Sequence, residues 1–311
     1  MKWIKELQEG DLLRGPLLVV VANKGVTNNS LGYMNITLQD KTGTIDAKKW
    51  DLSDEDAAII SVGNVIYVDG DVINYRDNLQ VKIRSVAAIN DGEVDTSRFT
   101  IASPIALEEL EQRLDVYVKS IRNNDAALIT KTLVDKYYKS YVTFPAAVRN
   151  HHEFASGLLH HTVQMADLAE AIAKLYPSVD RDMLIAGILL HDLGKTLELS
   201  GPIIPKYTLE GKLLGHISIT HAEIQKTIQE LKIEGEVPTL LSHMVLSHHG
   251  KYEYGSPVLP LTREAFLLSV IDDLDAKMMM LDKAYEQTAE GEFTTRIYAL
   301  DDRSFYKPKK K

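Results

Sequence analysis

The sequence predicts a multi-domain α+β protein in which a five-stranded β-barrel precedes an all-α domain. Up to about residue 90, apolar residues occur in short runs that alternate with polar ones, as in strands. From Ile105 to Glu290 they recur every three or four residues, as in helices. A polar segment, Asp91 to Ser103, separates the two parts, and Pro104 then opens the helical region.

The composition limits the class of protein. The chain has 311 residues, no cysteine and a formal net charge of −9 at pH 7. Without cysteine, disulfides, thiolate metal sites and cysteine nucleophiles are excluded, so any metal must take nitrogen and oxygen ligands. The excess of acid argues against polyanion binding by the whole surface, but it leaves a local groove open. Met1 to Asp11 lacks the apolar core of a signal peptide, and no apolar run is long enough to cross a bilayer. We therefore expect a cytoplasmic protein without a membrane partner.

The N-terminal strands predict a small closed barrel. In the run from Tyr33 to Gln39, for example, Met34, Ile36 and Leu38 face one way and polar residues face the other. Five strands with a short helix between the third and fourth are typical of such barrels. This order resembles the OB-fold, and the run from Tyr33 through Trp50 resembles its nucleic-acid-binding branch. We expect strands at 17–22, 33–39, 44–50, 65–72 and 79–84, and the short helix at 53–61.

Aromatic and basic residues on the predicted outer faces indicate a surface for single strands. Barrels of this kind stack bases on aromatic rings and follow the backbone with cations. The alternative is that Tyr33 and Trp50 cover a contact between domains, and the sequence does not choose between the two. The candidate nucleic-acid-binding residues are Tyr33, Lys48, Trp50, Lys82 and Arg84.

The helical part is organised around residues 183–195, which read Met-Leu-Ile-Ala-Gly-Ile-Leu-Leu-His-Asp-Leu-Gly-Lys. So dense an apolar run predicts a helix that is buried on nearly all sides. Burying an imidazole and a carboxylate at its end is costly unless something compensates, and a metal ion would do so. Taken alone, His191–Asp192 is more often a core histidine paired with an aspartate, so a metal site needs further ligands.

Four other helical segments contain side chains of the same kind. His161 shares an apolar stripe with Met165, whereas its neighbour His160 lies on a polar stripe, so we expect His161 to point inward and His160 outward. Within the doublets 248–249 and 272–273, spacing alone does not settle which residue points inward. The candidate metal ligands are His161, His191, Asp192, His216, His248 and Asp272.

The spread of these ligands over more than a hundred residues describes a pocket among helices, with positions open for substrate. A structural zinc site would usually gather ligands at closer spacing. Histidine and aspartate without cysteine fit one or two divalent ions. Mn²⁺ is the first candidate, and Co²⁺, Fe²⁺, Ni²⁺ and Zn²⁺ are the alternatives.

This order of ligands, with the run His191 to Lys195, resembles the HD-domain superfamily of metal-dependent phosphohydrolases over about residues 141–287. With the barrel in front, the chain resembles the YhaM-type 3′–5′ exoribonucleases, a family also described as CMP-binding factors. The stretches 38–43, 157–162 and 246–257 support this. The resemblance implies that the six candidates are metal ligands and that Lys195 contacts phosphate. It also implies release of nucleoside monophosphates from the 3′ end of single-stranded RNA, with single-stranded DNA a further substrate to consider.

We expect catalytic roles for Asp192, Lys195 and His249. Adjacent helical residues diverge too much to chelate one ion comfortably, so Asp192 is suited to bridge two ions. Lys195 would hold a phosphate oxygen; its alternative is a solvated lysine at the helix end. His249 and His152 are candidates to protonate the leaving group or to support a ligand. For His221 and His243 we expect core or surface roles.

The predicted organisation has four segments. These are an OB-like nucleic-acid-binding domain at 1–90, a linker with connecting helices at 91–140, an HD-type domain at 141–290 and a C-terminal basic tail at 291–311. Within the tail, Phe293 to Ala299 has some strand character, and we expect the end from Tyr306 to be a solvated terminus. Two other functions stay open. A phosphohydrolase of free or cyclic nucleotides would not need the barrel, and a non-catalytic single-strand-binding replication factor would not need the metal ligands. The sequence leaves open the metal, the preference for RNA over DNA, and whether the chain forms a homo-oligomer.

Overall fold

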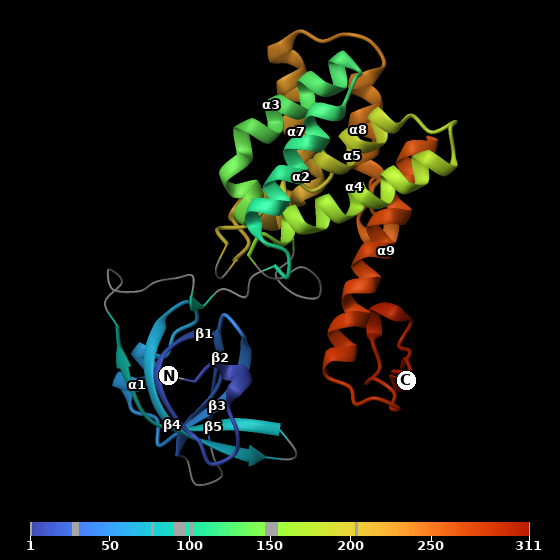
Figure 1. Ribbon diagram of the computed structural model, residues 1–311. Helices are drawn as coiled ribbons and strands as arrows, with labels where there is room; N and C mark the ends of the chain where they lie inside the picture. Colours follow the sequence, from blue (N-terminus) through green and yellow to red (C-terminus); the bar gives the residue numbers. More distant parts are fainter. Residues whose placement is uncertain are drawn as a thin grey trace. The chain divides into compact units, whose positions relative to one another are not determined.

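The computed structural model describes residues 2–26, 31–75, 78–89, 98–99, 103–146, 155–202 and 205–310. It divides the chain into two compact units: Met1–Ala102, the barrel unit, and Ser103–Lys311, the helical unit (Figure 1). The predicted fold class, a barrel followed by helices, is confirmed. Most of the expected linker at 91–103 lies outside the described residues.

The strands of the barrel unit close in the order β1-β2-β3-β5-β4. The pair β3–β5 is parallel, and the other pairs are antiparallel. Ser53 begins the short helix before β4, because its side chain accepts the backbone N–H of Asp56. The elements are η1 (Ile4–Glu6), β1 (Leu12–Val26), β2 (Gly32–Asp40), β3 (Gly43–Trp50), α1 (Asp54–Ile59), β4 (Val65–Tyr75) and β5 (Asn78–Ala88).

The barrel core follows the predicted alternation. Met34, Ile36 and Leu38 of β2 are buried, and the residues between them face outward or are half-buried. Lys49 departs from the pattern, since it occupies an inward position with only 8% of its surface exposed. Its ammonium lies 3.1 Å from the carboxylate of Asp56 on α1, and this ion pair compensates for its burial.

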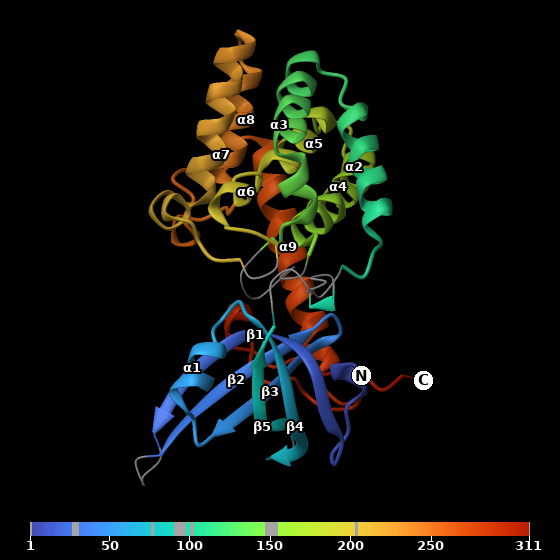
Figure 2. The ribbon, with the colours of Figure 1, turned by 90° about the vertical axis from the view of Figure 1, so that its left-hand side faces the viewer.

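The helical unit is built around α5 (Arg181–Leu190), which contacts α3, α4, α8 and α9. Every residue of α5 from Met183 to Leu190 is buried, as the apolar run predicts. Figures 1 and 2 show α5 among its neighbours. The other elements are α2 (Leu107–Ser120), α3 (Asn124–Thr143), α4 (Gly157–Leu175), α6 (Lys195–Glu198), α7 (Leu209–Leu231), α8 (Val237–Ser247), η4 (Tyr252–Tyr254), α9 (Arg263–Glu286) and η5 (Tyr298–Leu300).

We had expected the helices within 91–140 to be connecting helices. They are instead part of the helical unit. Leu110 and Leu114 of α2, and Ile129 and Leu133 of α3, belong to the same hydrophobic core as α5. Their amphipathic faces cover α4 and α5, and this burial places them with the helices that follow rather than between two domains.

Most residues of the expected C-terminal tail are folded, and the strand character expected for Phe293 to Ala299 agrees with this. They fold back as a hairpin in which Phe293 pairs with Tyr306 and Ile297 with Arg303. The ammonium of Lys307 donates to the carbonyl oxygens of Tyr285 and Thr288, at 2.7 and 2.8 Å, where α9 ends. Helix ends leave such carbonyls without partners, so the lysine is held by the fold and not by solvent. We call residues 291–307 the C-terminal hairpin; it lies beside the end of α9 in Figure 1.

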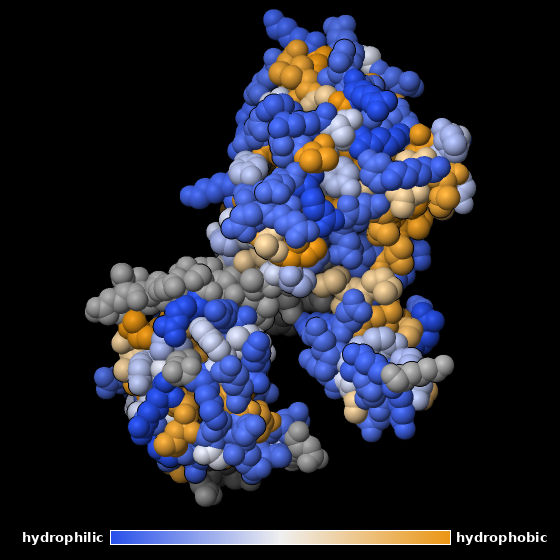
Figure 3. All heavy atoms as spheres, in the orientation of Figure 1, coloured by the Kyte–Doolittle hydropathy of each residue, from blue (hydrophilic) through white to orange (hydrophobic). Residues whose placement is uncertain are grey.

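On the face of the molecule shown in Figure 3, hydrophilic side chains cover most of each unit, and apolar side chains form separate patches between them. Among the described helices, none combines the length and the apolar character that crossing a membrane requires.

Candidate metal centre and its pocket

Two of the candidate histidines stand at the C-terminal ends of helices. His191 ends α5, and its Nδ1 lies 2.7 Å from the carbonyl oxygen of Ile188. His248 ends α8, and its Nδ1 lies 2.7 Å from the carbonyl oxygen of Val245. A carbonyl only accepts, so each Nδ1 carries the hydrogen and donates it. Each ring thus donates a hydrogen bond to a carbonyl oxygen in the last turn of its helix. The other nitrogen, Nε2, carries no hydrogen, so its lone pair is available for binding.

His161 is oriented by a carboxylate from a distant helix. Its Nδ1 lies 2.6 Å from Oδ2 of Asp275 on α9, and at most 1% of either residue is exposed. Asp272, one turn earlier on α9, lies 3.2 Å from Nε2 of the same ring. Burial lowers the pKa of His161, but the two carboxylates outweigh it and raise the pKa to about 10. A site so favourable to a proton on Nε2 also favours a metal cation in its place.

His216 is oriented by a break in α7. Gly215 has φ 71°, which interrupts the helix and lets His216 begin its second part. Oε1 of Glu198 accepts the backbone N–H of His216 at 3.0 Å and lies 3.3 Å from its Nδ1. The contact between α6 and α7 also explains a glycine in the central motif. A Cβ on Gly194 would lie 2.4 Å from the carbonyl oxygen of His216.

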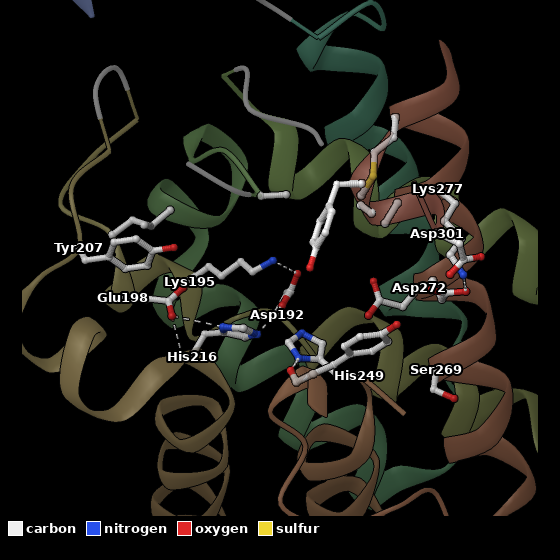
Figure 4. Close-up of a pocket in the computed structure, with 18 of the residues that line it drawn as sticks. Asp192, Lys195, Glu198, Tyr207, His216, His249, Ser269, Asp272, Lys277 and Asp301 are labelled. Atoms are coloured by element: carbon white, nitrogen blue, oxygen red, sulfur yellow. Dashed lines mark hydrogen bonds and ion pairs between the residues drawn. The ribbon is translucent and has the colours of Figure 1, made fainter. Parts of the chain in front are cut away.

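Asp192 lies between the histidines. Its Oδ2 is 3.3 Å from Nε2 of His191 and 3.9 Å from Nε2 of His161. Its Oδ1 is 3.3 Å from Nε2 of His216 and 3.7 Å from Nε2 of His248. The two carboxylate oxygens therefore face two different sets of imidazoles. Figure 4 shows Asp192 between Lys195 and His216.

Several of these atoms are buried without a hydrogen bond. Within the described part of the chain, Oδ1 of Asp192 and Nε2 of His191, His216 and His248 have no hydrogen-bond partner. Leaving polar atoms unpaired away from water costs free energy. Neutral imidazole nitrogen and carboxylate oxygen are ligands of divalent transition metals, so these residues fit such ions.

The candidate ligands form two groups. One contains His161, His191 and Asp192, and the other contains His216, His248 and His249; the ligand atoms within each group lie within 4.8 Å of one another. We had expected His249 to protonate the leaving group or to support a ligand, and we had left open whether His248 or His249 binds metal. Both belong to the second group, so His249 is also a candidate ligand. Its Nδ1 lies 2.7 Å from the carbonyl oxygen of Tyr254, which leaves Nε2 for the site. The signal in the sequence was the doublet 248–249 before Gly250, whose φ of +75° turns the chain there.

The structure brings all six predicted metal residues and Lys195 together. It also separates the doublet on α9: Asp272 faces His161, whereas Asp273 pairs with Lys277 at 2.6 Å. Two residues to which we gave no role, Asp275 and Glu198, orient His161 and His216. Helical spacing was the only feature of the sequence that could have identified them; Asp275, for example, follows Asp272 by three residues.

The expectation for His160 was wrong. The residue is 5% exposed, and its Nδ1 lies 3.0 Å from Oγ of Ser103. The segment that enters α2 covers this face of α4, which a polar stripe within α4 alone could not reveal. The other proposed proton donor, His152, lies outside the described residues.

Lys195 begins α6 and is 9% exposed, with its ammonium 2.6 Å from Oδ2 of Asp192. Burial lowers the pKa of Lys195, but the carboxylates of Asp192, Asp272 and Glu198 outweigh it, so the pKa is raised and the ammonium stays charged. Burial likewise works to raise the pKa of Asp192, but Lys195 and His191 hold it well below its usual value. Both charges therefore persist at neutral pH.

These groups open into a pocket of about 870 Å³. Figure 4 shows Lys195, Asp192 and Asp272 directed toward its middle, with Tyr207 on one side and Asp301 and Lys277 on the other. Among the residues that the structure describes, six carboxylates and two lysines line it. A phosphate would be repelled by this lining unless cations compensated for the negative charge. The carboxylates belong to Asp192, Glu198, Asp272, Asp273, Asp301 and Asp302, and the lysines are Lys195 and Lys277.

On the barrel unit, four of the five predicted nucleic-acid-binding residues lie side by side. Tyr33 pairs with Trp50 across β2 and β3, and Lys48 pairs with Lys82 across β3 and β5. The ammonium of Lys48 lies 4.3 Å from the Tyr33 ring centroid and 4.2 Å from that of Trp50. Trp50 is 40% exposed, so its ring is accessible. Arg84 is engaged elsewhere, since its Nε donates to Asp71 at 2.7 Å, and it must give up this ion pair to bind phosphate.

Comparisons with known proteins agree with both units. A family model described as "HD domain" matches residues 158–277, and one described as "OB-fold nucleic acid binding domain" matches residues 19–89. The chain is 47% identical over 308 residues to the "3'-5' exoribonuclease YhaM" of Geobacillus sp. (strain WCH70), covering 99% of this chain and 95% of that protein.

Solved structures resemble the barrel more weakly. The second OB-fold domain of replication protein A from Methanococcus maripaludis is 19% identical with a TM-score of 0.25, covering 29% of this chain and 95% of that one. PriB from Ralstonia solanacearum is 14% identical with a TM-score of 0.23, covering 26% of this chain and 98% of that one. At such TM-scores neither structure bears on function.

Proposed function

Because the chain belongs to the YhaM family of 3′-5′ exoribonucleases, we propose that it is a metal-dependent 3′–5′ exoribonuclease. It removes nucleoside monophosphates from single-stranded RNA, and single-stranded DNA is the second substrate to examine. The observation that carries the proposal is Asp192, whose two oxygens face separate histidine groups in a pocket that also holds Lys195. If the chain were a phosphohydrolase of free or cyclic nucleotides, the aromatic face of the barrel would have no role. If the chain were a non-catalytic replication factor, the candidate metal ligands would have no role.

The two ligand groups support two divalent cations. The first set is His161, His191, Asp192 and Asp272; the second is His216, His248 and His249, with Asp192 shared between the two. Mn²⁺ is the first candidate, and the same donors accept Co²⁺, Fe²⁺, Ni²⁺ or Zn²⁺. When bound, such ions lower the pKa of water and neutralise charge on the phosphate.

The chain's own residues position the substrate. Lys195, charged and nearly buried, holds a non-bridging oxygen of the scissile phosphate. Asp275 and Glu198 keep the rings of His161 and His216 turned toward the site, so the ligands are oriented before substrate arrives. Water adds to phosphorus and the bond to the 3′ oxygen of the preceding nucleotide breaks. The products are a 5′-monophosphate and a new 3′ hydroxyl.

The barrel unit supplies affinity for the strand. Tyr33 and Trp50 present rings on which bases can stack, and Lys48 and Lys82 supply positive charge beside them. Because the two units belong to one chain, binding on the barrel raises the effective concentration of the 3′ end at the metal site.

Digestion of RNA labelled at its 5′ end tests this function. With Mn²⁺, we expect the labelled strand to shorten progressively and monophosphates to be released. The double change His191→Ala with Asp192→Ala abolishes this, whereas His221→Ala, on α7 and not among the residues lining the pocket, leaves it intact. Undiminished cleavage in the double variant would refute the site. Cleavage of only free or cyclic nucleotides would indicate the first alternative, and RNA binding without any cleavage the second.

A further inference from the structure

The C-terminal hairpin forms part of the wall of the catalytic pocket. Its tip contributes Tyr298, Ala299, Asp301 and Asp302 to the lining, beside the metal-site carboxylates Asp192 and Asp272. Local contacts hold the tip together. Leu300 is 3% exposed, and its carbonyl oxygen accepts Nε of Arg303 at 3.0 Å. Asp301 and Asp302 are themselves paired with Arg303 and Arg296, each at 3.0 Å.

Within this fixed tip, the side chain of Tyr298 is 91% exposed. It makes no hydrogen bond, ion pair or ring contact with the described part of the chain. Two other aromatic residues of the same hairpin do contact each other: the rings of Phe293 and Tyr306 pack with their centroids 5.2 Å apart. A single exposed tyrosine is ordinary on a protein surface. Tyr298 differs from an ordinary exposed tyrosine because it lines the same pocket as Asp192 and Lys195.

Among the described residues, two other tyrosines line the pocket, and both are less exposed than Tyr298. Tyr254 has the ammonium of Lys251 5.3 Å from its ring centroid, and its carbonyl oxygen holds His249. Tyr207 lies beside Glu198 on the same side as Lys195 (Figure 4). The hairpin tip occupies the other side of the pocket, where Asp301 is seen. A nucleotide whose phosphate contacts Lys195 and whose base reaches the opposite side of the pocket would place that base at this tip.

We propose that Tyr298 stacks on the base of the 3′-terminal nucleotide while its phosphate lies at the metal site. The inference rests on the proposed function, because it assumes that a nucleotide is the substrate. Stacking uses the face of a base, so all four bases bind, and purines, which offer more surface, bind more tightly. The C-terminal hairpin is thus a substrate-binding element, with Tyr298 a determinant of how firmly the departing nucleotide is held.

Equilibrium binding of two small ligands to the full chain loaded with Mn²⁺ tests this. Adenosine 5′-monophosphate carries the base, and ribose 5-phosphate lacks it. Stacking on an aromatic side chain contributes about 1–3 kcal/mol per base, so we expect the first ligand to bind about 5- to 150-fold more tightly. In Tyr298→Ala this ratio falls to about one, through weaker binding of the nucleotide alone, whereas Tyr298→Phe retains it. The exposed side chain can be removed without unfolding the hairpin, and thermal unfolding verifies this.

Tyr176→Ala is the matched control, because Tyr176 is 60% exposed and is not among the residues lining the pocket. The proposal fails if Tyr298→Ala keeps the wild-type ratio, if Tyr207→Ala abolishes it instead, or if the wild-type chain shows no preference for the nucleotide. RNA digestion is measured separately on the same wild-type preparation. A chain that prefers the nucleotide through Tyr298 but cleaves no RNA would overturn the proposed function and leave the binding role standing.

Discussion

Oδ2 of Asp275 lies 2.6 Å from Nδ1 of His161, although the two residues are 114 positions apart in the sequence. The contact joins α9 to α4 and turns Nε2 of the ring toward Asp192 and Asp272. A carboxylate behind a metal-binding histidine fixes the ring and makes the ligand nitrogen more basic. Asp275 therefore orients a candidate ligand and is not itself among the described residues that line the pocket.

We expect Asp275→Asn to weaken divalent metal binding about 10- to 100-fold, because an amide keeps the shape of the contact but loses its charge. Isothermal titration of Mn²⁺ into the chain measures the affinity. The neighbouring change Asp273→Asn is the control, since Asp273 is exposed and pairs with Lys277. Equal losses in the two variants would mean that only the overall charge of α9 matters.

The two ligand groups predict different effects on metal content. The wild-type chain should retain two divalent ions after dialysis. His249→Ala removes a ligand from the second group alone and should leave one ion, whereas Asp192→Ala removes the carboxylate that both groups share and should leave fewer than one. Elemental analysis per mole of protein checks this. If His249→Ala keeps both ions, His249 is not a ligand and the role of proton donor regains support.

Gly194→Ala should destabilise the chain and displace His216. The added Cβ would lie 2.4 Å from the carbonyl oxygen of His216 and 2.9 Å from the backbone nitrogen of Thr220, and backbone atoms cannot easily yield. We expect a loss of about 1–3 kcal/mol in the free energy of unfolding, measured by chemical denaturation. Gly201→Ala is the control because its Cβ would meet nothing within 4 Å. An unchanged free energy of unfolding in Gly194→Ala would show that α6 and α7 can separate without cost.

Trp50→Ala should weaken binding of single-stranded RNA about 5- to 150-fold, while hydrolysis of a small phosphodiester is unchanged. The reason is that the exposed Trp50 belongs to the barrel unit, whereas the candidate metal ligands belong to the helical unit. Fluorescence anisotropy with a labelled oligonucleotide measures the affinity. Tyr67→Ala on β4 serves for comparison, since Tyr67 is 43% exposed and lies outside the predicted binding surface. Loss of both binding and hydrolysis would show that Trp50 is structural.

His243 predicts a pH dependence of stability. Its Nε2 accepts the backbone N–H of Leu261 at 2.9 Å, which only the neutral ring can do, and burial lowers the pKa of this ring below its usual 6.5. A lowered folded-state pKa means that the contribution is full above pH 6.5 and is lost as the pH falls through the folded-state value. Between about pH 7 and pH 5, the free energy of unfolding of the wild type should fall more than that of His243→Gln, whose amide oxygen accepts without titrating. Parallel curves from chemical denaturation would contradict this.

The sequence by itself determined the two kinds of domain and which histidines and aspartates were candidates to meet at one site. Burial can be predicted from the pattern within each segment. Residues 33–39 alternate between apolar and polar, and the run from Met183 to Leu190 has no charge. Helical spacing likewise assigned His161 to an inward face, where it is fully buried. Such periodicities depend on residues a few positions apart, so they can be detected without the fold.

Only the tertiary structure decided how these segments meet. It showed that His249 joins His216 and His248, that the segment before α2 covers His160, and that Asp275 supports His161. It also turned the expected basic tail into a hairpin that carries Tyr298 to the pocket. Each outcome depends on packing between segments far apart in the chain. The period of a single helix or strand carries no information about such partners, because it records which face is buried and not what covers it.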